Sequence, residues 1–295
     1  MTTTDAVTTT NTVTTTNTVT VTPTTNTRTT LRHALTDSVT MLRRQLRHMQ
    51  RYPSLTLMLA GMPIVFLLLF VYVFGGTLGD GLGGAANGET VGGRAGYLNY
   101  VVPGILLMTV SSAVQGTAIS VAMDMTEGII ARFRTMAIAR ASVLTGHVVG
   151  SMIQTMLGMG IVLGVALLIG FRPAADPVEW VAVIGVLAMI SFALIWLSVA
   201  LGMVTKTVEG ASNLPMPLVF LPFLASGFVP TDSMPAGLRA FAEHQPFTPF
   251  IETVRGLLMG TAIGNSAMIA AAWCAGIALV GYLWAKRLFN RDPVR

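Results

Sequence analysis

Long stretches of uncharged, apolar residues constrain this chain more than any other feature of its sequence. A helix needs about 20 apolar residues to cross the hydrocarbon core of a bilayer. Five runs are close to that length or longer, and a sixth is shorter and contains three prolines. The pattern predicts an all-α polytopic membrane protein whose transmembrane domain covers residues 53–295. The six expected spans are about 55–74, 100–123, 143–169, 180–204, 214–228 and 267–284.

The composition supports a membrane protein and excludes most soluble folds. Hydrophobic residues make up 53% of the 295 residues and charged residues only 11%, against roughly 25% charged in an ordinary soluble domain. A soluble fold with so few charges could not cover its surface. The single cysteine, Cys274, excludes an internal disulfide and a cysteine-based metal cluster.

The N-terminal region has two parts with different character. Residues 1–30 include 18 threonines and no hydrophobic run, which predicts a disordered tail. Residues 31–52 carry an apolar residue every three or four positions between several arginines. This pattern predicts an amphipathic helix that lies in the headgroup layer and binds membrane lipids.

The basic residues predict the orientation of the spans. Six spans place both termini on one side, and the segments on that side hold 14 Arg and Lys residues against four on the other side. Because basic residues concentrate in cytoplasmic segments, both termini are expected in the cytoplasm.

Two non-spanning segments are then expected on the outer side. Residues 75–96 are rich in glycine and are expected to form a loop. Residues 229–263 are broken by prolines, and such a segment is tolerated at membrane depth only where protein or water satisfies its backbone. The polar residues Glu243, His244 and Gln245 in this segment could form an external gate, or they could belong to a loop whose polar groups satisfy one another.

A few polar residues interrupt the apolar runs. Ser111, Ser112 and Gln115 lie in the second expected span, and Asn213 precedes the fifth. Such side chains face protein or water rather than lipid. They could line a substrate path or join one helix to another.

The sequence lacks the motifs of the common enzyme classes. It contains no G-x-x-x-x-G-K-[ST] phosphate loop, no H-E-x-x-H metal motif and no G-x-S-x-G nucleophile motif. The chain is therefore expected to be a non-catalytic subunit without a cofactor of its own.

Residues 124–140, D-M-T-E-G-I-I-A-R-F-R-T-M-A-I-A-R, form the most informative segment between two spans. Apolar residues at helical spacing predict a short amphipathic helix, with Arg132 and Arg134 on either side of Phe133. The helix could dock in a groove of a partner protein, or its arginines could hold lipid phosphates.

The stretch E-G-x-x-x-R-F-R-x-M resembles the signature of type-2 ATP-binding-cassette exporter permeases. The stretches S-G-F-V-P-T-D-S-M-P and F-A-E-H-Q-P-F-T-P, which start at residues 226 and 241, resemble the outer region of daunorubicin-resistance-type permeases in that family. The family pattern commonly has proline after the methionine, where this chain has Ala137. The resemblance implies that the 124–140 segment is a coupling helix, with contact residues Glu127, Gly128, Arg132, Phe133, Arg134 and Met136.

The resemblance also implies the working assembly. It places an amphipathic helix before six spans and short re-entrant helices between the fifth and sixth spans. Two permease chains would work with two ATPase chains, which would bind ATP and Mg²⁺. The expected function is export of hydrophobic, drug-type or antibiotic-type compounds across the plasma membrane, with no nucleic-acid partner. The alternatives are an exporter of lipid-linked glycan or polymer, a membrane enzyme and a non-transporting membrane scaffold.

Overall fold

The computed structural model describes residues 53–82, 93–126, 140–205 and 207–290. All regular secondary structure in these ranges is helical. The threonine-rich tail, the amphipathic helix expected at 31–52 and the coupling contacts expected at 127–136 lie outside the described residues. These three assignments therefore stay predictions.

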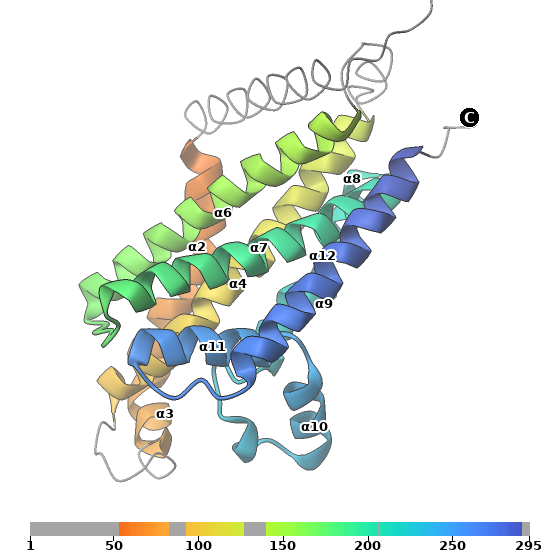
Figure 1. Cartoon of the computed structure of the whole chain (residues 1–295). Coiled ribbons are helices and arrows are strands. Elements are labelled where there is room, and N and C mark those ends of the chain that lie inside the picture. The colour runs from red at the N-terminus through yellow and green to blue at the C-terminus, as the bar shows by residue number, and fades with distance from the viewer. Residues whose placement is uncertain (1–52, 83–92, 127–139, 206, 291–295) are drawn as a thin grey trace, which may run out of the picture.

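Five described helical stretches are long and apolar enough to cross a membrane. They lie side by side as a bundle (Figure 1). The helix at Pro177–Val204 begins with a capping box, in which the Asp176 carboxylate accepts a hydrogen bond from the Glu179 amide (2.7 Å) and the Glu179 carboxylate accepts one from the Asp176 amide (2.9 Å). The long helices are α2 (Pro53–Leu69), α4 (Arg94–Thr126), α6 (Arg140–Ile169), α7 (Pro177–Val204) and α12 (Ser266–Asn290).

Helix α4 is the centre of the bundle. In its most apolar 18-residue stretch 72% of the residues are buried, against 17–50% in the other four stretches. Those helices instead expose large apolar side chains, such as Leu168 on α6 and Met268 on α12. Such exposure is expected of helices that face lipid, because lipid tails are as apolar as leucine.

The glycine-rich loop expected at 75–96 is shorter than the sequence suggested. Helix α2 continues through a π-helical turn (Phe70–Phe74) into α3 (Gly75–Leu82), and α4 already begins at Arg94. The prediction was wrong at both ends because glycine lowers helix propensity without forbidding a helix. Here glycine is needed for close contact, since a Cβ added to Gly79 would clash with the Gly93 carbonyl oxygen.

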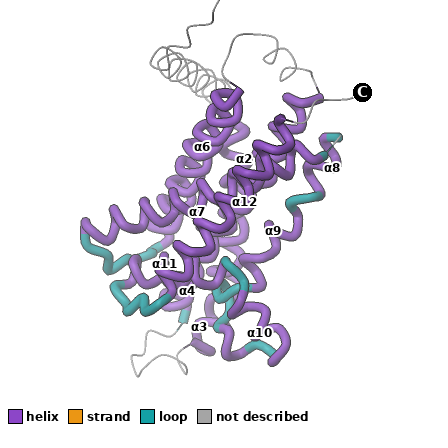
Figure 2. Tube along the Cα trace, turned by 45° about the vertical axis from the view of Figure 1, so that its right-hand side comes forward, coloured by secondary structure: helices purple, strands orange, loops and turns teal. Residues whose placement is uncertain are grey.

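The fifth expected span is not one continuous helix. The expected range, 214–228, contains α9 (Met216–Phe220) and a 3₁₀ turn (Leu221–Leu224), and a further short helix, α8 (Val208–Asn213), precedes it. We call residues 208–228 the broken segment. The three prolines explain the breaks, because proline lacks a backbone N–H and clashes with the preceding helical turn. Figures 1 and 2 both show this broken segment descending along the bundle from α8 through α9 towards α10.

The broken segment lies against α4 over much of its length. The Gln115 side chain contacts Ser212, and Gly104 packs on Gly227 further along. These two positions on α4 are eleven residues apart, or roughly 16 Å at 1.5 Å per residue. The segment therefore runs antiparallel to α4 for about half the thickness of a bilayer core.

Three short helical elements follow at one end of the bundle. They are a 3₁₀ turn (Thr231–Ser233), α10 (Ala236–His244) and α11 (Phe247–Met259). Helix α11 is largely buried, and the Leu258 carbonyl accepts a hydrogen bond from the Ala174 amide in the loop between α6 and α7 (2.9 Å). We call this the α11 end. The last turn of α4 and the start of α6 lie at the opposite end (Figure 1).

Candidate functional site along helix α4

The serines that interrupt the apolar run of α4 bond within their own helix. The Ser111 hydroxyl donates to the Leu107 carbonyl and the Ser112 hydroxyl to the Met108 carbonyl, each at 3.1 Å. Back-bonding of this kind satisfies a hydroxyl without a second helix. Ser111 is fully buried and Ser112 partly buried.

Gln115 does join two elements. Its Nε2 donates to the Ser212 carbonyl (2.9 Å) and lies 3.4 Å from the Ser212 hydroxyl. The contact ties the middle of α4 to α8, where Asn213 is exposed. Gln115 therefore acts as an interhelical contact in this state of the chain.

The three polar residues at the end of α10 do not form one cluster. Glu243 and His244 are exposed, and His244 Nδ1 lies 2.8 Å from the Ala240 carbonyl of its own helix. Gln245 is buried, with 5% of its surface exposed, and its Nε2 donates to the Leu221 carbonyl (3.3 Å). Gln245 thus fastens the end of α10 to the broken segment, while its neighbours face outward.

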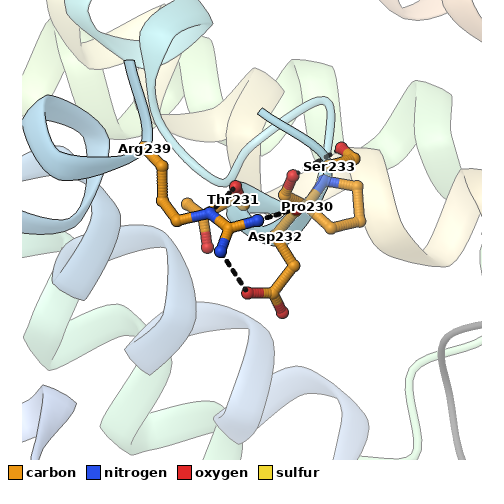
Figure 3. A network of polar contacts seen from close by, with 5 residues as sticks. All are labelled: Pro230, Thr231, Asp232, Ser233 and Arg239. Carbon is orange, nitrogen blue, oxygen red and sulfur yellow. Dashed lines mark hydrogen bonds and ion pairs between the residues drawn. The ribbon is translucent and has the colours of Figure 1, made fainter. Parts of the chain in front are cut away.

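The loop before α10 is held by a separate arginine. Arg239 Nε donates to the Thr231 carbonyl (3.1 Å), and its guanidinium also contacts the carbonyl and carboxylate of Asp232 (Figure 3). The Ser233 hydroxyl closes the same turn on the Pro230 carbonyl (2.7 Å). In this part of the 229–263 segment the polar groups therefore pair with one another.

The densest polar network surrounds the turn at residues 225–228, where the broken segment meets α4 and α11. Arg255 Nη2 donates to the Ser226 carbonyl (2.5 Å) and lies 3.3 Å from the Tyr100 carbonyl. The guanidinium carbon sits 3.9 Å from the centre of the Tyr100 ring. The Tyr100 hydroxyl donates to the same Ser226 carbonyl (2.8 Å), and the Tyr97 hydroxyl donates to the Phe228 carbonyl (3.3 Å).

Sequence analysis missed this network, because it counted Arg255 only as one of four basic residues on the outer side. A local signal was available. Phe247, Ile251, Val254 and Leu258 form an apolar stripe at helical spacing, and Arg255 lies four residues after Ile251, at the edge of that stripe. An arginine in that position must find hydrogen-bond partners among buried groups.

The expected coupling residues, 127–136, lie outside the described residues. Their flanking helices are described, and His147 Nε2 of α6 lies 2.9 Å from Asp124 Oδ2 of α4.

A bundle of five apolar helices, each long enough to cross a bilayer, with a buried central helix and a proline-broken segment beside it, defines a multi-pass membrane protein. The ABC-2 type transporter family matches residues 36–259, which is more than half of the chain. The chain therefore belongs to the ABC-2 type transporter family.

Curated relatives agree with this family. The chain is 26% identical over 258 residues to the daunorubicin resistance ABC transporter permease protein DrrB1 of Streptomyces coeruleorubidus, with 87% of each chain covered. It is also 26% identical to a probable doxorubicin resistance ABC transporter permease protein DrrC of Mycobacterium tuberculosis. That alignment spans 189 residues and covers 62% of this chain and 66% of the relative.

Proposed function

We propose that this chain is the transmembrane permease subunit of an ABC exporter that moves hydrophobic, drug-type compounds out across the plasma membrane. The observation that carries the proposal is the match over 87% of the chain to a relative named as a daunorubicin resistance permease. The five long apolar helices support it, because each is long enough to cross a bilayer.

The proposed permease crosses the membrane six times, with the broken segment as its fifth crossing. Two observations support this number. The broken segment runs antiparallel to α4 for much of the bundle. The loop between α6 and α7 contacts α11 at one end, whereas the end of α4, the start of α6 and the last turns of α12 lie at the other end. The α11 end is then the outer end, and both termini are cytoplasmic.

Cysteine labelling tests this orientation. Single cysteines replace Thr20, Gly84, Ala175 or Arg291 in a Cys274→Ala background. An impermeant thiol reagent added to intact cells should label the proteins with cysteine at positions 84 and 175, and only permeabilised cells should show labelling at 20 and 291. Labelling at position 20 in intact cells would overturn the proposed orientation.

We assign ATP hydrolysis to a separate ATPase subunit, which would bind ATP and Mg²⁺. This chain has no phosphate-loop motif, and we propose that a second copy of it completes the path. Residues 127–136 would form the contact with the ATPase.

Drug accumulation tests the whole proposal. Cells of a drug-sensitive strain receive the chain with its ATPase, the chain alone, or the chain with an ATPase whose phosphate-loop lysine is replaced by alanine. Only the first combination should lower the accumulation of an anthracycline. ATP hydrolysis by the purified chain alone, after controls for contaminants, would refute the assignment as a non-catalytic subunit.

A further inference from the structure

We propose that Arg255 is a latch that keeps the outer end of the path closed by clamping the turn at residues 225–228 onto α4. The role of this latch in transport rests on the proposed function. Its structural basis is independent of that function, because it follows from contacts within the described residues.

The position of the turn makes it a suitable place for a latch. It connects the broken fifth crossing to the helices at the outer end, so the two parts can move relative to each other only if it moves. The turn is packed directly on α4, since a Cβ added to Gly104 would lie 2.8 Å from the Gly227 carbonyl oxygen. Backbone therefore touches backbone at this point, and no side chain could yield in place of the turn.

Arg255 provides the strongest polar contact of the turn. Its guanidinium stays protonated in proteins, so its hydrogen bond to the Ser226 carbonyl is charge-assisted. The same group covers the face of the Tyr100 ring, where burial strengthens a cation–π contact. Glu252, one turn earlier on α11, accepts a hydrogen bond from the Ser266 hydroxyl at the start of α12 (2.9 Å). Helix α11 is thus tied to α4 by its arginine and to the last span by its glutamate.

The clamped arrangement also leaves polar groups unsatisfied. Arg255 Nε and the Ser226 hydroxyl are both buried and have no hydrogen-bond partner among the described residues. Unpaired buried groups disfavour the state in which they occur. Water or a substrate oxygen that reached this place on opening would pair them, so the latch is held by strong contacts and is still releasable.

Movement of the turn would also disturb its packing against the π-helical turn that follows α2. The Phe228 ring stacks on Phe223 with centroids 4.9 Å apart and lies 4.7 Å from the Phe70 ring in the π-helical turn that follows α2. Release of Arg255 would therefore free contacts on three crossings together, namely those formed by α2, by α4 and by the broken segment.

Thiol accessibility at position 226 tests the latch directly. Ser226 is 4% exposed and its hydroxyl makes no bond, so Ser226→Cys removes no contact. The full chain, carrying this change in the Cys274→Ala background, is reconstituted in liposomes and treated with a hydrophilic maleimide. We expect Arg255→Gln to raise the labelling rate by about tenfold or more, because a charge-assisted contact and a cation–π contact are lost. We expect a smaller rise with Arg255→Lys, which keeps the charge and loses the planar fork.

Matched controls separate the latch from general loosening. Arg239→Gln removes another arginine that donates to backbone carbonyls in the outer segment and should leave the labelling rate unchanged. Ser191→Cys, a buried position on α7 whose hydroxyl is also unpaired, reports unfolding of the bundle. If Arg255→Gln also accelerates labelling at position 191, a milder variant is compared instead. This variant is Tyr100→Phe, which removes one hydrogen bond and keeps the ring. A rise of about threefold at position 226 alone then supports the latch.

Two results keep this inference distinct from the proposed function. A labelling rate at position 226 that is unchanged by Arg255→Gln, Arg255→Lys and Tyr100→Phe would overturn the latch, even if the chain lowers drug accumulation with its ATPase. Faster labelling at position 226 without faster labelling at position 191 in the Arg255 variants would support the latch, even if no drug accumulation changes and the proposed substrate class is wrong.

Discussion

His147 Nε2 and Asp124 Oδ2 lie 2.9 Å apart and join the last turn of α4 to the start of α6. Both side chains are mostly buried, with 14% and 22% of their surfaces exposed. The two helices flank residues 127–139, which hold the expected coupling contacts. The pair therefore holds the last turn of α4 against the N-terminal part of α6.

Removal of either partner of this pair should destabilise the chain. We expect Asp124→Ala and His147→Ala each to lower the melting temperature in detergent, with a coupling free energy of about 1 kcal/mol in a double-mutant cycle. Glu209→Ala, at an exposed position on α8, should change little and serves as the control. Additive effects of the two substitutions would show that the contact contributes nothing to stability.

Charge reversal in the 124–140 segment should weaken the assembly with the ATPase. Arg132→Glu or Arg134→Glu is expected to reduce co-purification of the ATPase from membranes, because the reversed charge would repel an acidic groove. Phe133→Ala removes an apolar anchor, and such anchors typically contribute ~2 kcal/mol or more at an interface. Arg239→Glu, on α10 at the α11 end of the bundle, is the control at matched expression. If lipid phosphates are the real partners of this segment, all these variants will retain the ATPase.

Gln115 should matter more for stability than the neighbouring serine. Gln115→Leu removes a hydrogen bond between α4 and the broken segment, and interhelical bonds in membranes are worth about 0.6 kcal/mol on average. Ser112→Ala removes a bond within one helix and should leave the melting temperature almost unchanged. A path-lining role would instead appear as an altered range of exported drugs at unchanged stability.

The contact between Gly104 and Gly227 should not tolerate a methyl group. Gly104→Ala would place Cβ 2.9 Å from the Gly227 Cα, and overpacking of this kind typically costs about 1–3 kcal/mol. Gly116→Ala on the same helix meets nothing within 4 Å and should be neutral or slightly stabilising, as expected from helix propensity. Thermal melts of the two variants in detergent provide the comparison, and equal melting temperatures would contradict the close packing.

The long helices could be predicted from sequence because the requirement for them is local. In lipid every backbone N–H and C=O must be paired within the protein, so a long apolar run has to be helical. The ends of the helices were less predictable. At Gly75–Leu82 the helix continues through residues of low propensity, because packing of α3 on α4 outweighs that preference.

The candidate site was predictable only where a residue's environment follows from its own helix. Gln115 was recognised as a polar residue inside a span, and the structure gives it an interhelical partner. Gln245 was grouped with Glu243 and His244, its neighbours in sequence, but the end of α10 turns it inward and leaves them outside. No pattern within three residues contains that information.

The sequence by itself determined the membrane class, the approximate spans and the breaks caused by proline, since hydrophobicity and backbone hydrogen bonding act over neighbouring residues. Only the tertiary structure decided that α4 is central and that Arg255 faces inward. The partners of Arg255 are Tyr100, 155 residues away, and Ser226, 29 residues away. Such contacts depend on how whole helices pack, and the free energy that selects one packing is shared among residues far apart in the chain.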